Sequence, residues 1–289
     1  MLDFRTKTFI TVCKYMNFTK AAKALSITQP AVSQHIKFIE SAYNIKTFSF
    51  EGKKMFLTDK GEILLHALTT MQHDQNHLKE LLQTSPSENL SFGATLTVGE
   101  FIIKEKVIKY LKGHPNTSLK MNVANTKELL DLLDNGQIDI AIVEGYFPKN
   151  QYDYLPYSKE KYIGVCCPSH DFEEKTVLLD ELINETIIIR EPGSGTREIF
   201  ERAMEVCNYK INDFNNIIEI SNLNIIKDFV VQDCGITFIY EAAVKKELDN
   251  GSLRKINIQD FNVNHEISFI WRKNSMFSNE YHAVFKSLI

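Results

Sequence analysis

The hydrophobic positions of the first sixty residues predict three helices. Four apolar positions at helical spacing predict a first helix that ends near Asn17; they are Phe9, Val12, Cys13 and Met16. A second helix, capped by Thr19, is expected to run through Leu25. After a short turn at 26–28, a third helix opens at Gln29 with Pro30 in its first turn, where a missing N–H costs nothing.

The third predicted helix has two unlike faces. Its expected core positions are Val32, Ile36, Ile39 and Tyr43, and its opposite stripe consists of Pro30, Ser33, Gln34, Lys37 and Ser41. The second stripe contains no acid, whereas a merely solvated face usually mixes acids with bases. Glutamine pairs bidentately with adenine, and serine serves a base edge or a phosphate. The pattern favours a recognition helix for a DNA groove over a plain solvated helix.

A hairpin with a basic tip follows. Two short strands are expected at 47–50 and 55–57, joined by Glu51-Gly52-Lys53-Lys54. Such a hairpin is the wing of a winged helix-turn-helix over residues 1–58, and Lys53 and Lys54 would contact sugar-phosphate without reading sequence.

Charge is divided unequally along the chain. Residues 1–60 carry ten Lys and Arg against four Asp and Glu, a net of +6, so the whole-chain charge of −4 leaves −10 for the remainder. Basic charge on one small domain favours contact with a phosphate backbone, because binding releases condensed counterions. Chance clustering of solvated lysines is the alternative.

A heptad-like pattern occupies residues 59–84. Leucines and a methionine alternate steps of three and four around one polar position, Gln75; they are Leu64, Leu68, Met71, Leu78 and Leu82. This predicts a linker helix that pairs two chains, with Gln75 setting register, although the same helix could pack on its own body. Thr84-Ser85-Pro86-Ser87 then ends the helix, and a hinge is expected at 85–91.

The remaining residues alternate β-rich and helical runs. The expected strands include LTVGE, SLKMNVA, DIAIVE, YIGVCC, TIIIRE, NIIEI, GITFIY and EISFIWRK. This βαβ order predicts a parallel α/β sheet in each of two lobes, with lobe I starting at 92–162 and lobe II following at 163–265. In such a fold a ligand lies between the lobes, near strand carboxyl ends and helix N-termini.

A Gly-rich turn is the sharpest local motif of the rear half. Arg190-Glu191-Pro192-Gly193-Ser194-Gly195-Thr196-Arg197 brings hydroxyls to a helix start, where exposed N–H groups suit an anion, although a capped turn without ligand gives the same pattern. Ser194, Gly195 and Thr196 are therefore candidate ligand contacts. Similar strand-to-helix junctions add Thr126, Ser221 and Asn222.

The run FTKAAKALSITQPAVSQHIKFIE followed by MFLTDKGEILL resembles the N-terminal domain of LysR-type transcriptional regulators. The resemblance implies a winged helix-turn-helix, a long linker helix and a two-lobed α/β sensor domain like a periplasmic binding protein. It also implies that residues 266–289 return to lobe I, which then covers 92–162 plus 266–289. It also implies that Gln29, Pro30, Ser33 and Gln34 meet the major groove, with Thr28 and Lys37 near phosphates. Phe50 stands where the family usually carries an arginine, which removes one expected backbone contact.

Further expectations follow from the same resemblance. PGSGTR is similar to the effector-cleft motif of the cysteine and carbon-fixation regulators within the family. The partners implied are double-stranded DNA carrying an inverted repeat, a second copy of the chain as a dimer or a dimer of dimers, and RNA polymerase. An unidentified small-molecule effector is expected and no cofactor.

One departure from the family changes the expected effector. After LTVGE, the expected first sensor strand, Val98-Gly99 runs directly into the next helix, and the loop is about six positions shorter than the family usually has. The missing positions include hydroxyls that commonly hold an anion, and Glu100 would repel one. The effector is then neutral or cationic, or the cleft is too narrow and regulation has another input.

Two other classes of function remain as alternatives. A two-lobed solute-binding protein would share the rear half, but the basic head and the lack of a signal peptide oppose it. An enzyme is not expected, because no Walker loop, HExxH or GxSxG is present and the histidines lack metal spacing. We expect a cytoplasmic protein whose five cysteines pack in its cores, with redox sensing as the lesser alternative.

Overall fold

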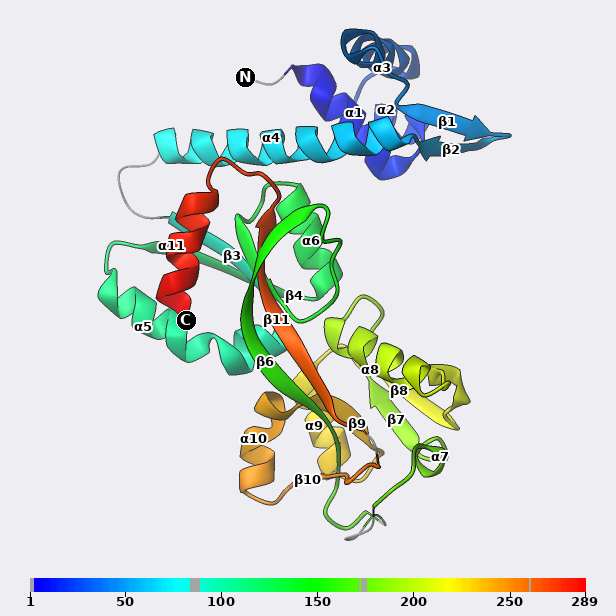
Figure 1. Cartoon of the computed structure of the whole chain (residues 1–289), viewed down its shortest axis with the longest axis vertical. Helices are drawn as coiled ribbons and strands as arrows, with labels where there is room; N and C mark the ends of the chain where they lie inside the picture. Colours follow the sequence, from blue (N-terminus) through cyan, green and yellow to red (C-terminus); the bar gives the residue numbers. More distant parts are fainter. Residues whose placement is uncertain (1–2, 84–88, 171, 173–175, 260) are drawn as a thin grey trace.

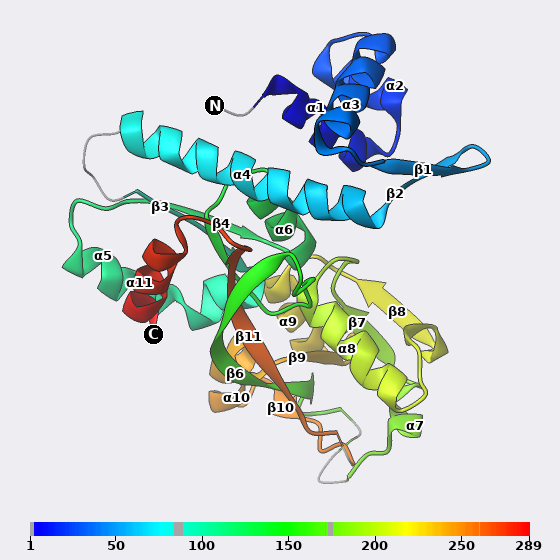
Figure 2. The same cartoon turned by 45° about the horizontal axis from the view of Figure 1, so that its top comes forward.

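The computed structural model describes residues 3–83, 89–170, 172, 176–259 and 261–289. A small helical domain with a β-hairpin stands at one end, a long helix crosses beneath it, and two α/β lobes follow (Figure 1). A second view shows the long helix lying across the first lobe (Figure 2). The predicted fold class is confirmed.

Three helices and a hairpin form the N-terminal domain. They are α1 (Phe4–Tyr15), α2 (Phe18–Leu25), α3 (Gln29–Tyr43), β1 (Phe48–Glu51) and β2 (Lys54–Leu57). The periodic apolar positions are buried as predicted, except that Met16 is only partly buried and Tyr43 is 56% exposed; Ile45, beyond the end of α3, packs on the core instead of Tyr43. The second helix is capped by Asn17, whose side chain accepts from the N–H of Lys20, and not by Thr19.

Helix α4 (Asp59–Gln83) joins the head to the sensor. Only part of the predicted heptad pattern is exposed and so able to contact a second chain. Leu64 and Leu68 are buried in the N-terminal core, whereas Met71 and Leu82 are 53% and 78% exposed. The expected hinge at 85–91 falls partly outside the described residues, at 84–88, and partly within strand β3 (Asn89–Thr95).

Lobe I is built on a mixed sheet. Its strands are β3, β4 (Ser118–Ala124), β5 (Ile140–Val143), β6 (Tyr152–Cys166) and β11 (Val263–Arg272), and its helices are η1 (Val98–Ile102), α5 (Lys104–Gly113), α6 (Thr126–Asp134) and α11 (Ser278–Leu288). Strand β3 pairs in parallel with β4 and β5, as the βαβαβ pattern predicted. Strand β11 lies antiparallel between β5 and β6.

Lobe II has the same layered construction. It contains α7 (Leu179–Leu182), β7 (Thr186–Ile189), α8 (Gly195–Val206), η2 (Ile211–Asp213), β8 (Asn216–Glu219), α9 (Leu223–Val231), β9 (Thr237–Tyr240), α10 (Glu241–Asp249) and β10 (Arg254–Lys255). Strands β7 and β8 are parallel, and β9 and β10 pair with the far half of β6. The long strands β6 and β11 therefore pass between the lobes (Figure 1), and the expected boundaries at 162/163 and 265/266 fall within them.

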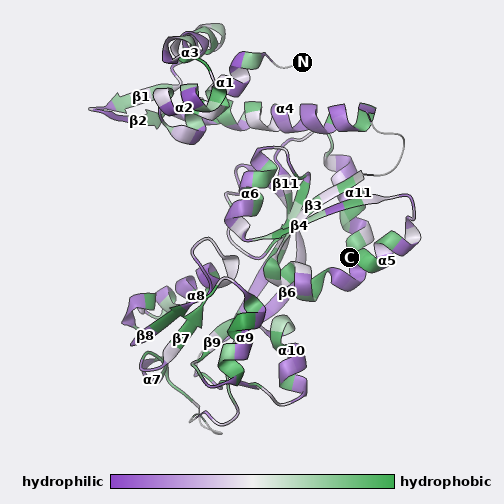
Figure 3. Ribbon diagram, turned by 180° about the vertical axis from the view of Figure 1, so that it is seen from behind, coloured by the Kyte–Doolittle hydropathy of each residue, from purple (hydrophilic) through white to green (hydrophobic). Residues whose placement is uncertain are grey.

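Buried apolar clusters line both faces of the sheets. In Figure 3 the strands β7 and β9 and helix α9 are largely hydrophobic. Three of the five cysteines are buried as expected, and burial raises the pKa of the Cys13 thiol to about 12; Cys207 is half-buried, and Cys234 is exposed, contrary to the expectation. Among the described residues, no helix combines the length and apolarity needed to cross a bilayer.

Candidate functional site

The outer face of α3 is polar and exposed. Thr28 caps the helix, since the N–H of Ala31 donates to its Oγ1 at 3.3 Å. The side chains of Gln29, Pro30, Gln34 and Lys37 are exposed, whereas Ser33 is half-buried and its Oγ accepts from Gln29 Nε2 at 3.0 Å. The residues predicted from the sequence for this surface thus lie together on one face of α3, where they can form hydrogen bonds with a binding partner.

Side chains behind α3 fix its orientation. Thr8 Oγ1 lies 2.9 Å from His35 Nδ1, which ties α3 to α1. At the other end, Glu40 accepts from the N–H and the hydroxyl of Thr47, at 2.8 and 3.0 Å. Burial raises the pKa of Glu40, but these hydrogen bonds and that from Lys46 outweigh it and lower the pKa below its usual range. Since Thr47 leads into β1, this carboxylate holds the hairpin against α3.

The hairpin turn is shorter than predicted. Glu51 pairs with Lys54 in the ladder, so the turn consists of Gly52 and Lys53 alone, with Gly52 at a φ of +59°. Lys53 is exposed at the tip, while the ammonium of Lys54 lies 5.0 Å from the ring centre of Phe56. Phe50, at the position where the family usually has arginine, is 62% exposed.

The first sensor strand was predicted in the wrong place. Strand β3 covers Asn89–Thr95, and LTVGE instead lies beyond it, with Leu96 and Thr97 in helical conformation and Val98-Gly99-Glu100 at the start of η1. The hydroxyls that seemed missing are therefore present: Thr95 ends β3, Thr97 lies two residues further on, and these residues are 1% and 0% exposed. The expectation that missing residues narrow the cleft is therefore wrong.

The two lobes touch at a pair of glycines. Gly145 follows β5 in lobe I and Gly195 opens α8 in lobe II; a Cβ on Gly195 would lie 2.6 Å from the nitrogen of Gly145. Thr126, at the start of α6, borders the same contact, because a Cβ on Gly145 would lie 2.5 Å from its Oγ1. Nearby, the N–H of Lys127 donates to the carbonyl of Gly193 at 3.5 Å. The motif 190–197 therefore faces the carboxyl ends of β4 and β5.

A buried carboxyl group crosses this contact. Thr196 Oγ1 donates to Glu144 Oε1 at 2.6 Å, and Glu144 is 1% exposed. Burial raises the pKa of Glu144, although the hydroxyl of Thr196 and the charge of Arg190 oppose this effect. Sequence reasoning missed Glu144, Thr95 and Thr97. Glu144 could have been predicted, because an acid and a glycine directly follow the fully apolar strand IAIV and the carboxyl ends of strands line such clefts.

Several buried polar atoms gather around Glu144. Within the part of the chain that the structure describes, the following have no hydrogen-bond partner: Thr95 Oγ1, Thr97 Oγ1, Thr126 Oγ1, Ser194 Oγ, Glu144 Oε2 and Arg190 Nη1. Buried polar groups without partners are unusual and costly, so a concentration of them marks a place built for a polar ligand or for water.

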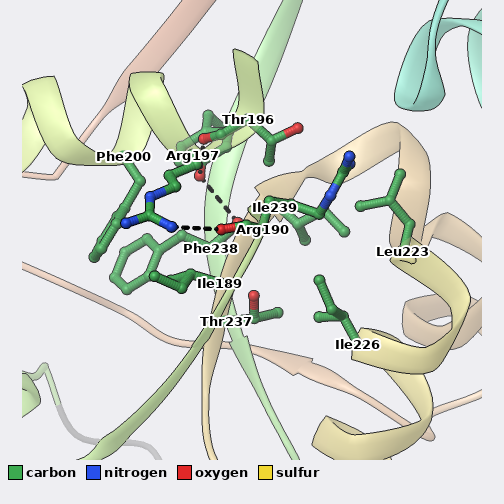
Figure 4. A pocket seen from close by; sticks show the side chains of 11 residues that line it. Ile189, Arg190, Thr196, Arg197, Phe200, Leu223, Ile226, Thr237, Phe238 and Ile239 are labelled. Carbon is green, nitrogen blue, oxygen red and sulfur yellow. Dashed lines mark hydrogen bonds between the residues drawn. The ribbon is translucent and has the colours of Figure 1, made fainter. Parts of the chain in front are cut away.

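Behind the start of α8 lies a small cavity of about 10 Å³, enough for roughly one water molecule. Figure 4 shows Arg197 reaching across its wall, where Nη1 donates to the carbonyl of Arg190 at 3.0 Å. Arg190 itself pairs through Nε and Nη2 with both carboxylate oxygens of Glu191. The cavity is too small for an effector, and it lies within lobe II.

The other predicted cleft residues lie elsewhere. Glu100 lines a separate groove with α10, and its Oε2 accepts from Asn224 Nδ2 at 3.3 Å. Asn222 caps α9 by accepting from the N–H groups of Asn224 and Ile225, and Ser221 beside it is exposed. Thr126, Ser194, Gly195 and Thr196 are thus brought together, while Glu100, Ser221 and Asn222 are not part of that cluster.

Polar contacts dock α4 on lobe I. Asp74 accepts from Ser275 Oγ at 2.6 Å and from the N–H of Met276 at 2.8 Å. His77 Nδ1 lies 2.6 Å from Asp139 Oδ1. Burial lowers the pKa of His77, but Asp139 and Glu280 outweigh it and raise the pKa above its usual value. The helix that leaves the head is therefore held by the lobe that carries Glu144.

Comparison with known proteins agrees with this organisation. Residues 5–62 match the family model of bacterial regulatory helix-turn-helix proteins of the LysR family, and residues 83–288 match the LysR substrate binding domain. The described residues contain no group of three or more side chains arranged to hold a metal ion.

Relatives span nearly the whole chain. An uncharacterized HTH-type transcriptional regulator of Methanocaldococcus jannaschii is 30% identical over 261 residues, covering 89% of this chain and 88% of its own. A probable RuBisCO transcriptional regulator of Cyanophora paradoxa is 25% identical, covering 89% and 82%. Full-length LysG of Corynebacterium glutamicum with bound effector Arg shares the fold, with a TM-score of 0.61, 15% identity and coverage of 100% and 98%. The chain belongs to the LysR family of DNA-binding transcriptional regulators.

Proposed function

We propose that this regulator binds an inverted repeat as a homodimer, and that a small molecule bound between its sensor lobes changes how it binds DNA. The observation that carries the proposal is the exposed, acid-free face of α3 beside a basic hairpin tip. Gln29, Ser33 and Gln34 would meet base edges, and Pro30 would pack beside them in the major groove. Thr28, Lys37, Lys53 and Lys54 would contact the backbone.

The second copy is proposed to bind along α4. Met71, Leu78 and Leu82 are exposed apolar side chains on this helix, at 53%, 39% and 78%. Exposed apolar side chains on one helix favour a partner surface, and two half-sites of an inverted repeat require two heads. RNA polymerase is proposed as a further partner, because a regulator bound at a promoter lies next to it.

The effector is proposed to act through lobe closure. The cluster around Glu144 lies where the lobes touch, and LysG, which shares the fold, has been solved with bound effector Arg. Lobe I carries Glu144 on one side and the docking contacts of α4 on the other. A ligand that binds one lobe arrangement better than another would shift the population and so the spacing of the paired heads.

Two variants of the full-length protein test the assignment of reading and positioning roles. Gln34→Ala should weaken binding to the selected operator by about 1–3 kcal/mol and leave random DNA unaffected. Lys53→Ala should weaken both equally and flatten the slope of log affinity against log salt by roughly one. Lys120→Ala, an equal charge change on β4 of the sensor, is the matched control. Equal losses on operator and random DNA for Gln34→Ala would contradict the assignment.

A further inference from the structure

The first turn of α8 lacks the cap that helices usually have. Ser194 occupies the N-cap position, but its side chain accepts no hydrogen bond from the helix. The first N–H groups of a helix have no partner within it, and the helix dipole adds partial positive charge there. With Gly195 at the first position, no side chain covers these groups, so a carboxylate can approach them closely.

Glu144 of lobe I supplies that carboxyl group. Its Oε1 accepts from Thr196 Oγ1 at 2.6 Å, and the backbone N–H of Thr196 also acts to lower its pKa. The side chain passes so close to Gly195 that a Cβ there would lie 2.8 Å from Glu144 Cγ. Burial is costly for this acid and raises the pKa of Glu144, while the N–H and hydroxyl of Thr196 and the charge of Arg190 act in the opposite direction and favour the ionised form.

We propose that Glu144 is a built-in anion: its carboxylate occupies the anion position at the start of α8 and thereby latches lobe I to lobe II. The latch joins the carboxyl end of β5 to a helix of the other lobe, at the contact of Gly145 with Gly195.

A consequence for the effector rests on the proposed function of the cleft. A free anion cannot share the start of α8 with Glu144, because two like charges at this distance in a buried site repel strongly. The effector group that enters here is therefore a hydrogen-bond donor or a cation. It would face Glu144 Oε2 and the hydroxyls of Thr97 and Thr126, which have no other partner among the described residues.

Chemical rescue in the full-length protein tests the latch without using DNA. Glu144→Ala removes the carboxylate and leaves space that formate or acetate can enter. Glu205→Ala, which removes an exposed acid from the same helix, is the matched control. Thermal unfolding is followed with increasing sodium formate or acetate, and sodium chloride corrects for ionic strength.

Formate or acetate should raise the unfolding temperature of Glu144→Ala by about 2–3 °C at ten times its Kd, and change neither the wild type nor Glu205→Ala. A folded Glu144→Ala that gains nothing beyond chloride, or a wild type stabilised equally, would overturn the proposal. If Glu144→Ala does not fold, Glu144→Gln keeps the shape without the charge, and hydrogen exchange at residues 191–197 should rise severalfold. Unchanged exchange would overturn the latch. Loss of operator binding without any change in these measurements would contradict the proposed function and leave the latch standing.

Discussion

Adding one methyl group at Gly195 should separate the lobes. The new Cβ of Gly195→Ala would lie 2.6 and 2.7 Å from the nitrogen and Cα of Gly145 and 2.8 Å from Glu144 Cγ. Ordinary contacts between such atoms are about 3.5–4.0 Å, so the facing backbone must retreat by nearly 1 Å. Overpacking of this kind costs about 1–3 kcal/mol, which lowers the ratio of closed to open lobes by about 5- to 150-fold.

Hydrogen exchange read by mass spectrometry measures this opening. Segments 142–148 and 190–198 should exchange faster in Gly195→Ala by a factor within that range, while the N-terminal domain is unchanged. Gly113→Ala, at the end of α5, is the control, because a Cβ there meets nothing within 4 Å. Alanine is the better helix former, so a purely local effect would stabilise α8. Exchange and unfolding temperature like those of Gly113→Ala would refute the closure argument.

Three further perturbations test separate parts of the structure. Thr28→Ala removes the cap of α3 and should lower the free energy of unfolding by about 1 kcal/mol in urea titrations. An unchanged urea midpoint would show that the cap does not stabilise the fold. The raised pKa of His77 means that its contact with Asp139 stabilises the fold fully below the ordinary histidine pKa and that this contribution is lost as pH rises through the folded value. Unfolding temperature should therefore fall with rising pH from about 6.5 more steeply in the wild type than in His77→Gln, and parallel curves would contradict it. Met71→Glu with Leu82→Glu should lower the mass in light scattering from dimer to monomer, and a persistent dimer would place the interface in the sensor.

The helical head could be predicted because its signals are local. The apolar stripe of α3 and Pro30 in its first turn specify the helix and its start. The start of α2 was wrong because Asn17 and Thr19 are both able to cap. Phe18 decides between them: its ring packs 5.9 Å from that of Phe48, which requires it to lie inside the helix.

The first sensor strand was misplaced for a tertiary reason. Strand β3 contains Gly93, a residue that a sequence pattern reads as unfavourable for a strand. A Cβ there would lie 2.5 Å from Leu129 Cδ2 and 2.8 Å from Ile138 Cδ1, so the buried side chains of Leu129 and Ile138 occupy the space that glycine leaves. That packing lies outside any local window, and the error removed Thr95 and Thr97 from the predicted cleft.

The linker helix shows the same limit. Its heptad pattern is real, but Leu64 and Leu68 belong to the core of the head, and Asp74 and His77 bind lobe I through polar contacts. Hydrophobic spacing alone cannot show that one helix packs on both the head and lobe I. The cluster around Glu144 was predicted only in part, because Glu144 is joined to it by a hydrogen bond from a residue of the other lobe, Thr196.

Selection of genomic fragments tests the central claim most directly. The purified full-length protein is mixed with sheared DNA of its source genome at physiological salt, with excess competitor DNA, and bound fragments are sequenced beside those retained by Gln34→Ala. We predict enrichment of a short inverted repeat whose half-sites lie about one or more helical turns apart, and its loss in the variant. Recovery of fragments without a shared sequence, or the same fragments with Gln34→Ala, would contradict sequence reading by α3.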